Sequence, residues 1–483
     1  MRKFFVAVAG VAVVFALAAV GWAATNNKSE LLKDESHRLA QMNREYTGGR
    51  KAGSQSGSIR VVGRNTLGGR GFNADVWAHD GHAYVGQWGF TDWAAGSKTR
   101  FCPSGDRAGV AVVNTTTMQR VGTLRNPAGT SAEDVVVYTG KNGRDYAAVG
   151  IQVCGGSRYD MSFFRGLQLF DVTDPANPSQ VSRLSTGCCT RGLHELEVEH
   201  HANGGIYVYA TVPTSRYADE ETTSGYRDEL GRGDFRMIDM TNPAAPKAVS
   251  NWGVQDEPGL VEQIGPGQGC DADPNYGHGA EPSGDGTTVF LAYWDAGFIA
   301  LDVSDPADPT YLRRAAFEAN EDGDAHSSMY DDARGLLFSA DEDFCKSSGP
   351  GIEKGYGYLR VWDYWNPAGP VQIGEFRGPS AFGTYAVGSG DYTIHNPFLV
   401  GTDVYASWYS GGIRVIDASN PRAMREIAHW VPPASQNPVK PSQRGTLSQT
   451  PQVWGVYVER MNGVDRIYAS DMNSGLWVLE RTR

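Results

Sequence analysis

Hydrophobic and polar residues alternate in short runs along this chain, and the runs recur. The clearest run, Gly166–Asp171, ends in an aspartate and continues into Val-Thr-Asp-Pro. Alternation with a period of two is typical of a β-strand, and Asp-Pro opens a turn. Four further copies keep both the aspartate and the Asp-Pro or Asn-Pro pair: Phe235–Pro243, Phe298–Pro306, Leu359–Pro367 and Ile413–Pro421. The pattern predicts a repeated unit of strand and turn.

Two weaker copies flank these five, at Val110–Asn114 and at Leu476–Glu480. Successive copies are about 55–70 residues apart, slightly more than the usual period of a propeller blade. Seven polar residues end the repeated strands: Asn114, Asp171, Asp239, Asp302, Asp363, Asp417 and Glu480. We expect the aspartates to accept hydrogen bonds from backbone N–H groups of the turns that follow them.

Each unit contains four alternating runs. In the second unit they are Glu133–Val137, Tyr146–Val149, Leu167–Asp171 and Gln180–Leu184. The last unit lacks a fourth run, whereas Ile59–Thr66 is an extra run of the same kind at the front. A strand supplied from the N-terminal end would complete the last sheet and remove an open edge. The pattern predicts an all-β, seven-bladed β-propeller closed by this N-terminal strand.

The repeated Leu-Gln-Leu-Phe-Asp-Val-Thr-Asp-Pro of residues 167–175 and its relatives resemble LVIVD repeats, a group of bacterial and archaeal β-propeller repeats. The resemblance covers roughly residues 58–483. It implies a propeller, but a fold shared by many activities does not by itself assign a function.

The composition agrees with this fold, and the net charge limits the classes of partner that the protein could bind. The chain has 60 glycines and 11% aromatic residues, which suits many short strands joined by turns. A repeat that fills residues 58–483 indicates one large domain rather than the two or three that 483 residues would usually suggest. The net charge of −12 disfavours nucleic acid and anionic membrane surfaces as partners.

The N-terminus has the pattern of an export signal. Arg2 and Lys3 precede the apolar run Phe4–Ala19, and Gly21–Ala23 fits a small-x-small cleavage site. We expect a signal peptide at residues 1–23 and a polar leader at 24–57, with the protein secreted, at the cell surface or periplasmic. The alternative is a retained membrane anchor, because the run approaches spanning length. No second apolar segment is long enough to span a membrane after cleavage.

Export would place the six cysteines in an oxidising compartment, where disulfides form. Cys102 and Cys154 follow the second strands of adjacent units, so they are the expected disulfide pair. The remaining connectivity is open.

The candidate chemistry lies at the starts of the first strands. Aligned by the alternation that follows, the seven units place these residues at one equivalent position: Ala74, Glu133, His194, His278, His326, His395 and Gln452. The chain has only ten histidines, and four of them fall in this register. The inner strands of a propeller surround its axis, so we expect the four imidazoles to converge at one mouth of the channel.

Converging neutral imidazoles suit copper or zinc better than calcium or magnesium. We expect Glu133 to add an oxygen ligand, and four further residues to support the ligands or line the rim: Gln452, Asp295, Asp341 and Asp471. The alternative is a hydrogen-bonded polar plug of the channel, with water between the rings.

No nucleophile elbow, zinc-protease helix, phosphate loop or dinucleotide fingerprint is present. Three functions therefore stay open. The first is an exported metalloprotein, an oxidoreductase acting on a small molecule. The second is a non-catalytic module that binds an extracellular protein or glycan. The third is a hydrolase or lactonase that uses the metal as a Lewis acid.

Overall fold

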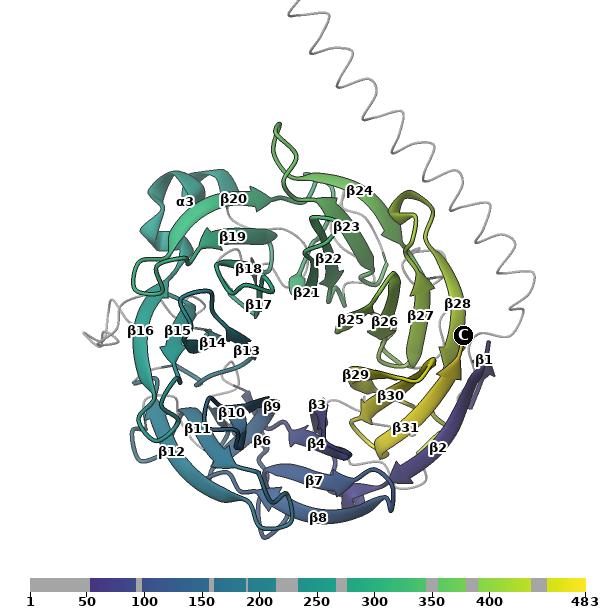
Figure 1. Cartoon of the computed structure of the whole chain (residues 1–483). Helices are drawn as coiled ribbons and strands as arrows, with labels where there is room; N and C mark the ends of the chain where they lie inside the picture. Colours follow the sequence, from purple (N-terminus) through teal and green to yellow (C-terminus); the bar gives the residue numbers. More distant parts are fainter. Residues whose placement is uncertain are drawn as a thin grey trace, which may run out of the picture.

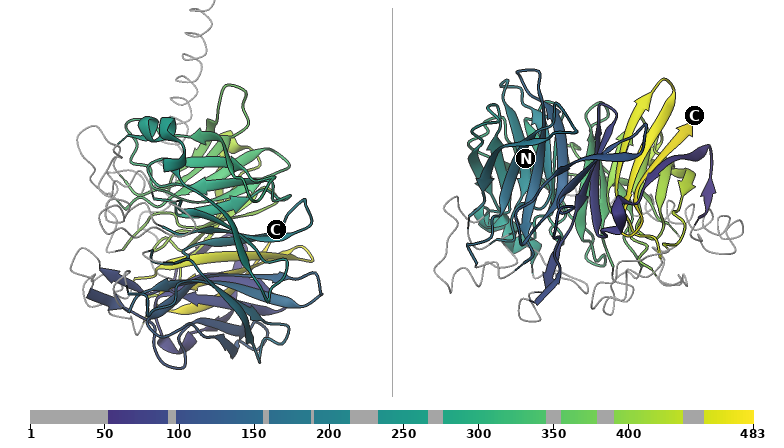
Figure 2. Two further views of the ribbon diagram at one scale, coloured as in Figure 1. Left: turned by 90° about the vertical axis from the view of Figure 1, so that its left-hand side faces the viewer. Right: turned by 90° about the horizontal axis from the view of Figure 1, so that it is seen from below.

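The computed structural model describes residues 53–92, 98–155, 160–187, 190–213, 233–265, 276–344, 355–378, 390–435 and 450–483. Their strands form antiparallel sheets that are arranged as a ring around one axis (Figure 1). Seen from the side, the strands of each sheet run roughly along the depth of the ring (Figure 2). The described helices are short: η1 (Leu67–Gly69), η3 (Val254–Asp256), α3 (Pro258–Ile264) and η5 (Pro421–Ala423). The fold is an all-β propeller.

Four sheets contain four consecutive strands each, with a fifth strand added to one of them. The first is β13 (Leu196–His200), β14 (Ile206–Thr211), β15 (Phe235–Asp239) and β16 (Lys247–Trp252). The second is β17 (Gly279–Pro282), β18 (Thr288–Ala292), β19 (Phe298–Asp302) and β20 (Thr310–Ala315). The third is β21 (Ala325–Asp331), β22 (Leu336–Asp341), β23 (Leu359–Asp363) and β24 (Val371–Phe376). The fourth is β25 (Pro397–Val400), β26 (Asp403–Ser407), β27 (Ile413–Asp417) and β28 (Arg425–Trp430).

Two more four-strand units share one sheet, because β4 pairs with β9 as well as with its own neighbours. One unit is β3 (Asn73–His79), β4 (His82–Gln87), β7 (Val110–Asn114) and β8 (Gln119–Leu124). The other is β9 (Thr130–Thr139), β10 (Asp145–Val153), β11 (Gly166–Asp171) and β12 (Ser179–Ser185). A small hairpin, β5 (Phe90–Asp92) with β6 (Lys98–Phe101), interrupts the first unit.

The N-terminal and C-terminal parts of the described chain meet in one sheet. Strand β2 (Ile59–Asn65) pairs antiparallel with β31 (Gly475–Thr482), which continues into β30 (Val464–Asp471) and β29 (Val453–Met461). Contacts between neighbouring inner strands run round the whole ring, through β3, β9, β13, β17, β21, β25, β29 and back to β3.

The polar leader expected to reach residue 57 contributes a strand near its end. Strand β1 (Gln55–Ser56) pairs with β28 at His429 and Trp430. The Ser56 hydroxyl lies 2.7 Å from Nδ1 of His429, and this contact ties the pair to the outer edge of the sheet. The rest of the leader, residues 24–52, lies outside the described residues.

Four of the five repeated aspartates accept backbone N–H groups of the turns that follow them, as predicted, whereas Oδ2 of Asp363 accepts the side-chain amide of Asn366 at 3.1 Å. Oδ1 of Asp302 accepts the backbone N–H of Ser304 at 2.9 Å, and Oδ1 of Asp171 accepts that of Thr173 at 3.1 Å. Asp239 and Asp417 do the same, while Glu480 pairs with arginine side chains instead. These residues are satisfied within their own blades or neighbouring strands, which marks them as structural.

The hydrophobic core lies between neighbouring blades. Each sheet packs one face against the sheet before it and the other face against the sheet after it. One cluster joins Phe338 and Val361 of one blade to Val404 and Trp408 of the next. Within the described ranges, no helix combines the length and apolar character that crossing a membrane requires.

Candidate metal centre

Four imidazoles form one row along the inner strands. His326 lies in β21, and the other three immediately precede inner strands: His194 before β13, His278 before β17 and His395 before β25. Ring centroids of successive imidazoles are 4.3, 3.8 and 4.1 Å apart, from His194 to His395. The register predicted from the sequence thus brings four side chains from consecutive blades into contact.

The row is buried. His194 and His278 are each 5% exposed, His326 is 1% exposed and His395 is fully enclosed. Buried polar nitrogens require partners, because leaving one unsatisfied costs about 1–3 kcal/mol. The partners of each ring therefore decide what the row can do.

His194 and His278 have partners. Nδ1 of His194 lies 2.7 Å from Oε2 of Glu133 and 2.9 Å from Nε2 of Gln152. With the Gln152 amide as donor, Nδ1 accepts and Nε2 carries the hydrogen, a tautomer assigned from this network. Nε2 of His194 then donates to Nε2 of His278 at 2.7 Å, and Nδ1 of His278 donates to the His326 carbonyl at 3.1 Å. One continuous hydrogen-bond chain joins this half of the row.

His326 and His395 differ. Neither ring nitrogen of either residue makes a hydrogen bond within the described part of the chain. The carbonyls of His395 and Trp454 favour the protonated forms of His326 and His395, but these contacts do not meet hydrogen-bond geometry. Four buried ring nitrogens on two adjacent imidazoles are thus left without a hydrogen bond.

Two carboxylates face these nitrogens. Nε2 of His326 lies 3.5 Å from Oε2 of Glu342 and 3.9 Å from Oε1 of Glu195. Nε2 of His395 lies 3.9 Å from Oε1 of Glu342, which also accepts the Tyr409 hydroxyl. Glu195 approaches Nδ1 of His278 at 3.4 Å.

These residues make two groups whose ligand atoms lie within 4.8 Å of one another: Glu195 with His278 and His326, and Glu342 with His326 and His395. Each group is two histidines and one carboxylate, a donor set that zinc, copper and iron accept. The two groups share His326, whose Nε2 lies within 4 Å of both carboxylates.

Burial shifts the pKa values of the carboxyls and imidazoles in these two groups. It raises the pKa of Glu342 to about 8 and that of Glu195 well above the usual range of a carboxyl. It holds the pKa of His326 and of His395 well below 6.5, with neighbouring imidazoles acting in the same direction. Burial therefore favours neutral imidazoles and protonated carboxyls in the metal-free group, and a bound cation would replace the carboxyl protons.

The other residues predicted for the site lie at its margins. Glu133 contacts His194 and belongs to neither three-residue group. Gln452 donates from Nε2 to Asp391 at 2.9 Å, and its backbone N–H donates to Asp471 at 2.6 Å. Asp341 binds the buried guanidinium of Arg360 at 2.5 Å.

Asp295 lies in a different acidic group, with Asp322 and Asp324.

The sequence predicted the imidazoles of the row but missed the carboxylates beside them, Glu195 and Glu342. Both directly follow a residue that the sequence singled out, His194 and Asp341. Only the backbone geometry shows that their side chains turn toward His326.

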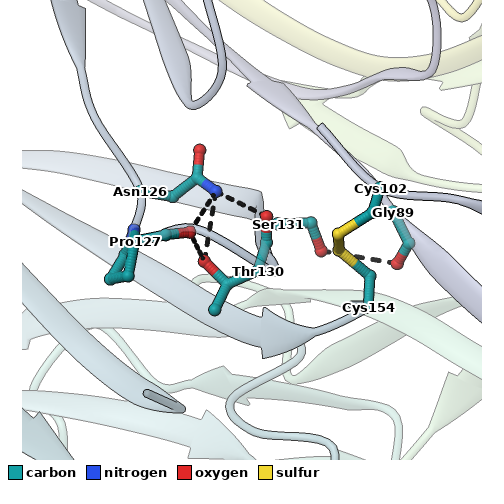
Figure 3. Close-up of a disulfide and its surroundings, with 7 residues drawn as sticks. All are labelled: Gly89, Cys102, Asn126, Pro127, Thr130, Ser131 and Cys154. Carbon is teal, nitrogen blue, oxygen red and sulfur yellow. Dashed lines mark hydrogen bonds between the residues drawn. A yellow bond between two sulfur atoms is a disulfide. The ribbon is translucent and has the colours of Figure 1, made fainter. Parts of the chain in front are cut away.

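Cys102 and Cys154 are joined as a disulfide across a sequence separation of 52 residues (Figure 3). The bond ties the loop after β6 to the end of β10. The other cysteines, Cys188, Cys189, Cys270 and Cys345, lie outside the described residues.

Comparisons with known proteins agree with the architecture. The family model for the LVIVD repeat matches residues 286–314, which cover β18 and β19 with the aspartate turn between β19 and β20. The chain thus carries an LVIVD repeat at residues 286–314, within one blade of its β-propeller.

Solved structures resemble it at low sequence identity. The crystal structure of Chaetomium thermophilum Raptor is 12% identical with a TM-score of 0.49, covering 92% of this chain and 30% of Raptor. The Cps50 (Swd1) β-propeller domain of Myceliophteria thermophila is 10% identical with a TM-score of 0.48, covering 87% of this chain and 98% of that domain. The chain thus spans about a third of Raptor. The search of curated proteins found no match.

Proposed function

We propose that this protein is an exported metalloprotein that binds one transition-metal ion, copper or zinc, on the propeller axis. His326, His395 and Glu342 are the primary ligands. Glu195 lies on the other side of Nε2 of His326 and would add a further carboxylate ligand, whereas both ring nitrogens of His278 are already hydrogen-bonded.

One observation carries this proposal. The buried ring nitrogens of His326 and His395 make no hydrogen bond within the described residues, although two carboxylates lie within 4 Å of them. A plug made only of protein groups would satisfy these nitrogens, as the neighbouring His194 and His278 are satisfied. A cation would give Nε2 of His326 and Nε2 of His395 a partner beside the carboxylates that face them.

An oxidoreductase is the activity that the surroundings favour. Trp454 and Tyr409 contact His395 directly, with ring centroids 4.5 and 5.2 Å away, and both are readily oxidised aromatic side chains. The ion would supply the one-electron chemistry. Glu342 and the Tyr409 hydroxyl that binds it would hold a proton beside the ion.

Hydrolysis is the second candidate, because two histidines and one glutamate also make up the zinc site of several hydrolases. The identity of the bound metal separates the two activities. Copper favours the oxidoreductase and zinc favours the hydrolase or lactonase.

The proposal also covers the number of blades, the strand that closes the ring and the export of the protein. We propose seven blades, with β2 closing the last one. The pairing of β2 with β31 and the unbroken circuit of inner-strand contacts support this number. Export through a signal peptide at residues 1–23 remains a proposal from the N-terminal pattern, and the Cys102–Cys154 disulfide is compatible with it.

Metal titration tests the proposed function. Metal-free protein mixed with copper(II) or zinc(II) in a calorimeter should bind one equivalent of at least one of them. X-ray absorption of the complex should show imidazole ligands, with distances of about 2.0–2.1 Å for zinc. Binding of neither ion, or spectra with oxygen ligands alone, would contradict the proposal.

A further inference from the structure

A cluster of mostly aromatic side chains lies beside His395. Its core is Phe72, Tyr409, Trp454 and Met472, and Trp88 and Phe101 pack against this core. The cluster comes from blades at the two ends of the chain, so the ring closure brings it together. None of the hydrolase, binding-module or metal-site arguments requires this arrangement.

The indoles of the cluster make a short path away from the metal centre. The Trp454 ring centroid is 4.5 Å from that of His395, and the Trp88 centroid is 5.3 Å from that of Trp454. Burial decreases along the path: His395 is fully enclosed, Trp454 is 6% exposed and Trp88 is half-buried. The path thus leads from an enclosed ligand to a ring that solvent reaches.

Hydrogen bonds fix the indole of Trp454 and the backbone of Trp88. Trp454 donates its indole N–H to Oδ2 of Asp75 at 3.2 Å. The backbone N–H of Trp88 donates to the carbonyl of Phe72 at 2.8 Å.

The disulfide fixes the outer end of the path. Gly89 follows Trp88 and lies against the Cys102–Cys154 bond, so that a Cβ at this glycine would meet Sγ of Cys154 at 3.0 Å (Figure 3). Phe101, next to Cys102, stacks on Phe72 at 4.5 Å. The crosslink therefore lies beside the backbone that carries Trp88.

We infer that Trp454 and Trp88 carry single electrons between the metal ion and a soluble one-electron acceptor that meets the protein at Trp88. This inference rests on the proposed function, in its oxidoreductase form. One electron passes from the reduced ion through Trp454 and then Trp88 to the acceptor, and neither indole stays oxidised. The ion rises by one oxidation state and the acceptor is reduced by one electron. No bond forms or breaks, and no proton leaves the chain.

The experiment measures electron transfer separately from metal binding. Wild-type protein and the variants Trp88→Phe, Trp454→Phe and Trp365→Phe are loaded with copper(I), and the copper content of each is determined first. Each is mixed by stopped flow with a cationic cobalt(III) phenanthroline complex, chosen because the chain carries a net charge of −12. The appearance of copper(II) is followed by absorbance and by electron paramagnetic resonance.

Trp365 is the matched control, because it is 37% exposed and contacts Tyr330 and Arg313 away from the row of histidines. We expect oxidation to slow at least tenfold in Trp88→Phe and in Trp454→Phe, and to be unchanged in Trp365→Phe. Equal rates in Trp88→Phe and wild type, at equal copper content, would overturn the path and leave the metal site standing. Binding of zinc but not copper would overturn the path in the same way. Failure of every ion to bind would overturn the proposed function itself.

Discussion

The two halves of the histidine row differ in what surrounds them. His194 and His278 are joined in a hydrogen-bond chain that begins at Gln152 and ends at a backbone carbonyl. His326 and His395 occupy equivalent positions in the next two blades, are buried more deeply, and make no such bonds within the described chain. The same residue at the same place in the repeat is thus structural in one half and available to a ligand in the other.

This difference shows that register alone does not define a site. A repeated fold copies a residue's position from blade to blade, but the neighbours of each copy decide whether its polar atoms are satisfied. The turn aspartates illustrate the satisfied case, since Asp302 and Asp171 accept N–H groups two residues further along the chain. His326 and His395 are the two copies whose ring nitrogens need a partner from outside the chain.

The largest effect on stability should come from opening the ring, because the closed ring holds both halves of the histidine row in place. Deleting residues 58–70 removes β2 and its pairing with β31. We expect the free energy of unfolding to fall by more than about 4 kcal/mol, a loss beyond that of most single substitutions. Chemical denaturation followed by tryptophan fluorescence measures it. Deleting residues 25–50 is the control and should leave stability unchanged; equal stability of both deletions would refute closure by β2.

The next largest effect should be on metal affinity, from a substitution in the half of the row whose ring nitrogens make no hydrogen bonds. His326→Ala should weaken metal binding at least 100-fold, because Nε2 of His326 faces both carboxylates of the centre. The metal-free variant should unfold at the same denaturant concentration as wild type or a higher one, since it loses buried nitrogens that have no hydrogen bonds. Calorimetric titration and denaturation measure the two quantities. A large loss of metal-free stability with unchanged metal affinity would instead indicate a structural plug.

The satisfied half should behave in the opposite way. His194→Ala leaves Gln152 and His278 without their shared partner, at a cost of about 1–3 kcal/mol in the metal-free protein. Metal affinity should change less than tenfold, because His194 belongs to neither three-residue group. The same two measurements apply. Loss of metal binding in His194→Ala would erase the distinction between the halves.

The pH dependence should be the most gradual effect. Burial raises the pKa of Glu342 from 4.5 to about 8, so the folded metal-free protein favours the protonated carboxyl. Its contribution to metal-free stability is complete below pH 4.5 and declines as pH rises toward 8. Metal binding must displace this proton, so affinity should increase with pH up to about 8 and level off above it. Titrations in buffers of different ionisation enthalpy would reveal the released proton; affinity that falls between pH 6 and 8 would contradict this assignment.

The sequence predicted the all-β propeller and many of its strands, because each copy of the repeat contains the same alternating strands and turn residues. The runs at Tyr146–Val149 and Gln180–Leu184 lie inside β10 and β12, and the extra run Ile59–Thr66 corresponds to β2. These features depend on local alternation and on turn residues, which one sequence displays directly.

The site was predicted only in part, because its chemistry depends on side-chain directions near the axis. The histidine register was visible, but nothing in the pattern separates His278 from His326. Glu195 and Glu342 sit where the strand enters or leaves the sheet, and alternation does not fix the direction of their side chains there. Gln452, equivalent to the histidines by register, turns to Asp391 instead.

A crystal structure of the copper- or zinc-loaded protein, with anomalous scattering recorded at the absorption edge of the metal, tests the central claim most directly. The account predicts one anomalous peak per chain, bonded to Nε2 of His326 and to His395 and a Glu342 oxygen, at about 2.0–2.2 Å. A peak confined to the acidic group of Asp295, Asp322 and Asp324, or no peak beside His326 at saturating metal, would contradict it.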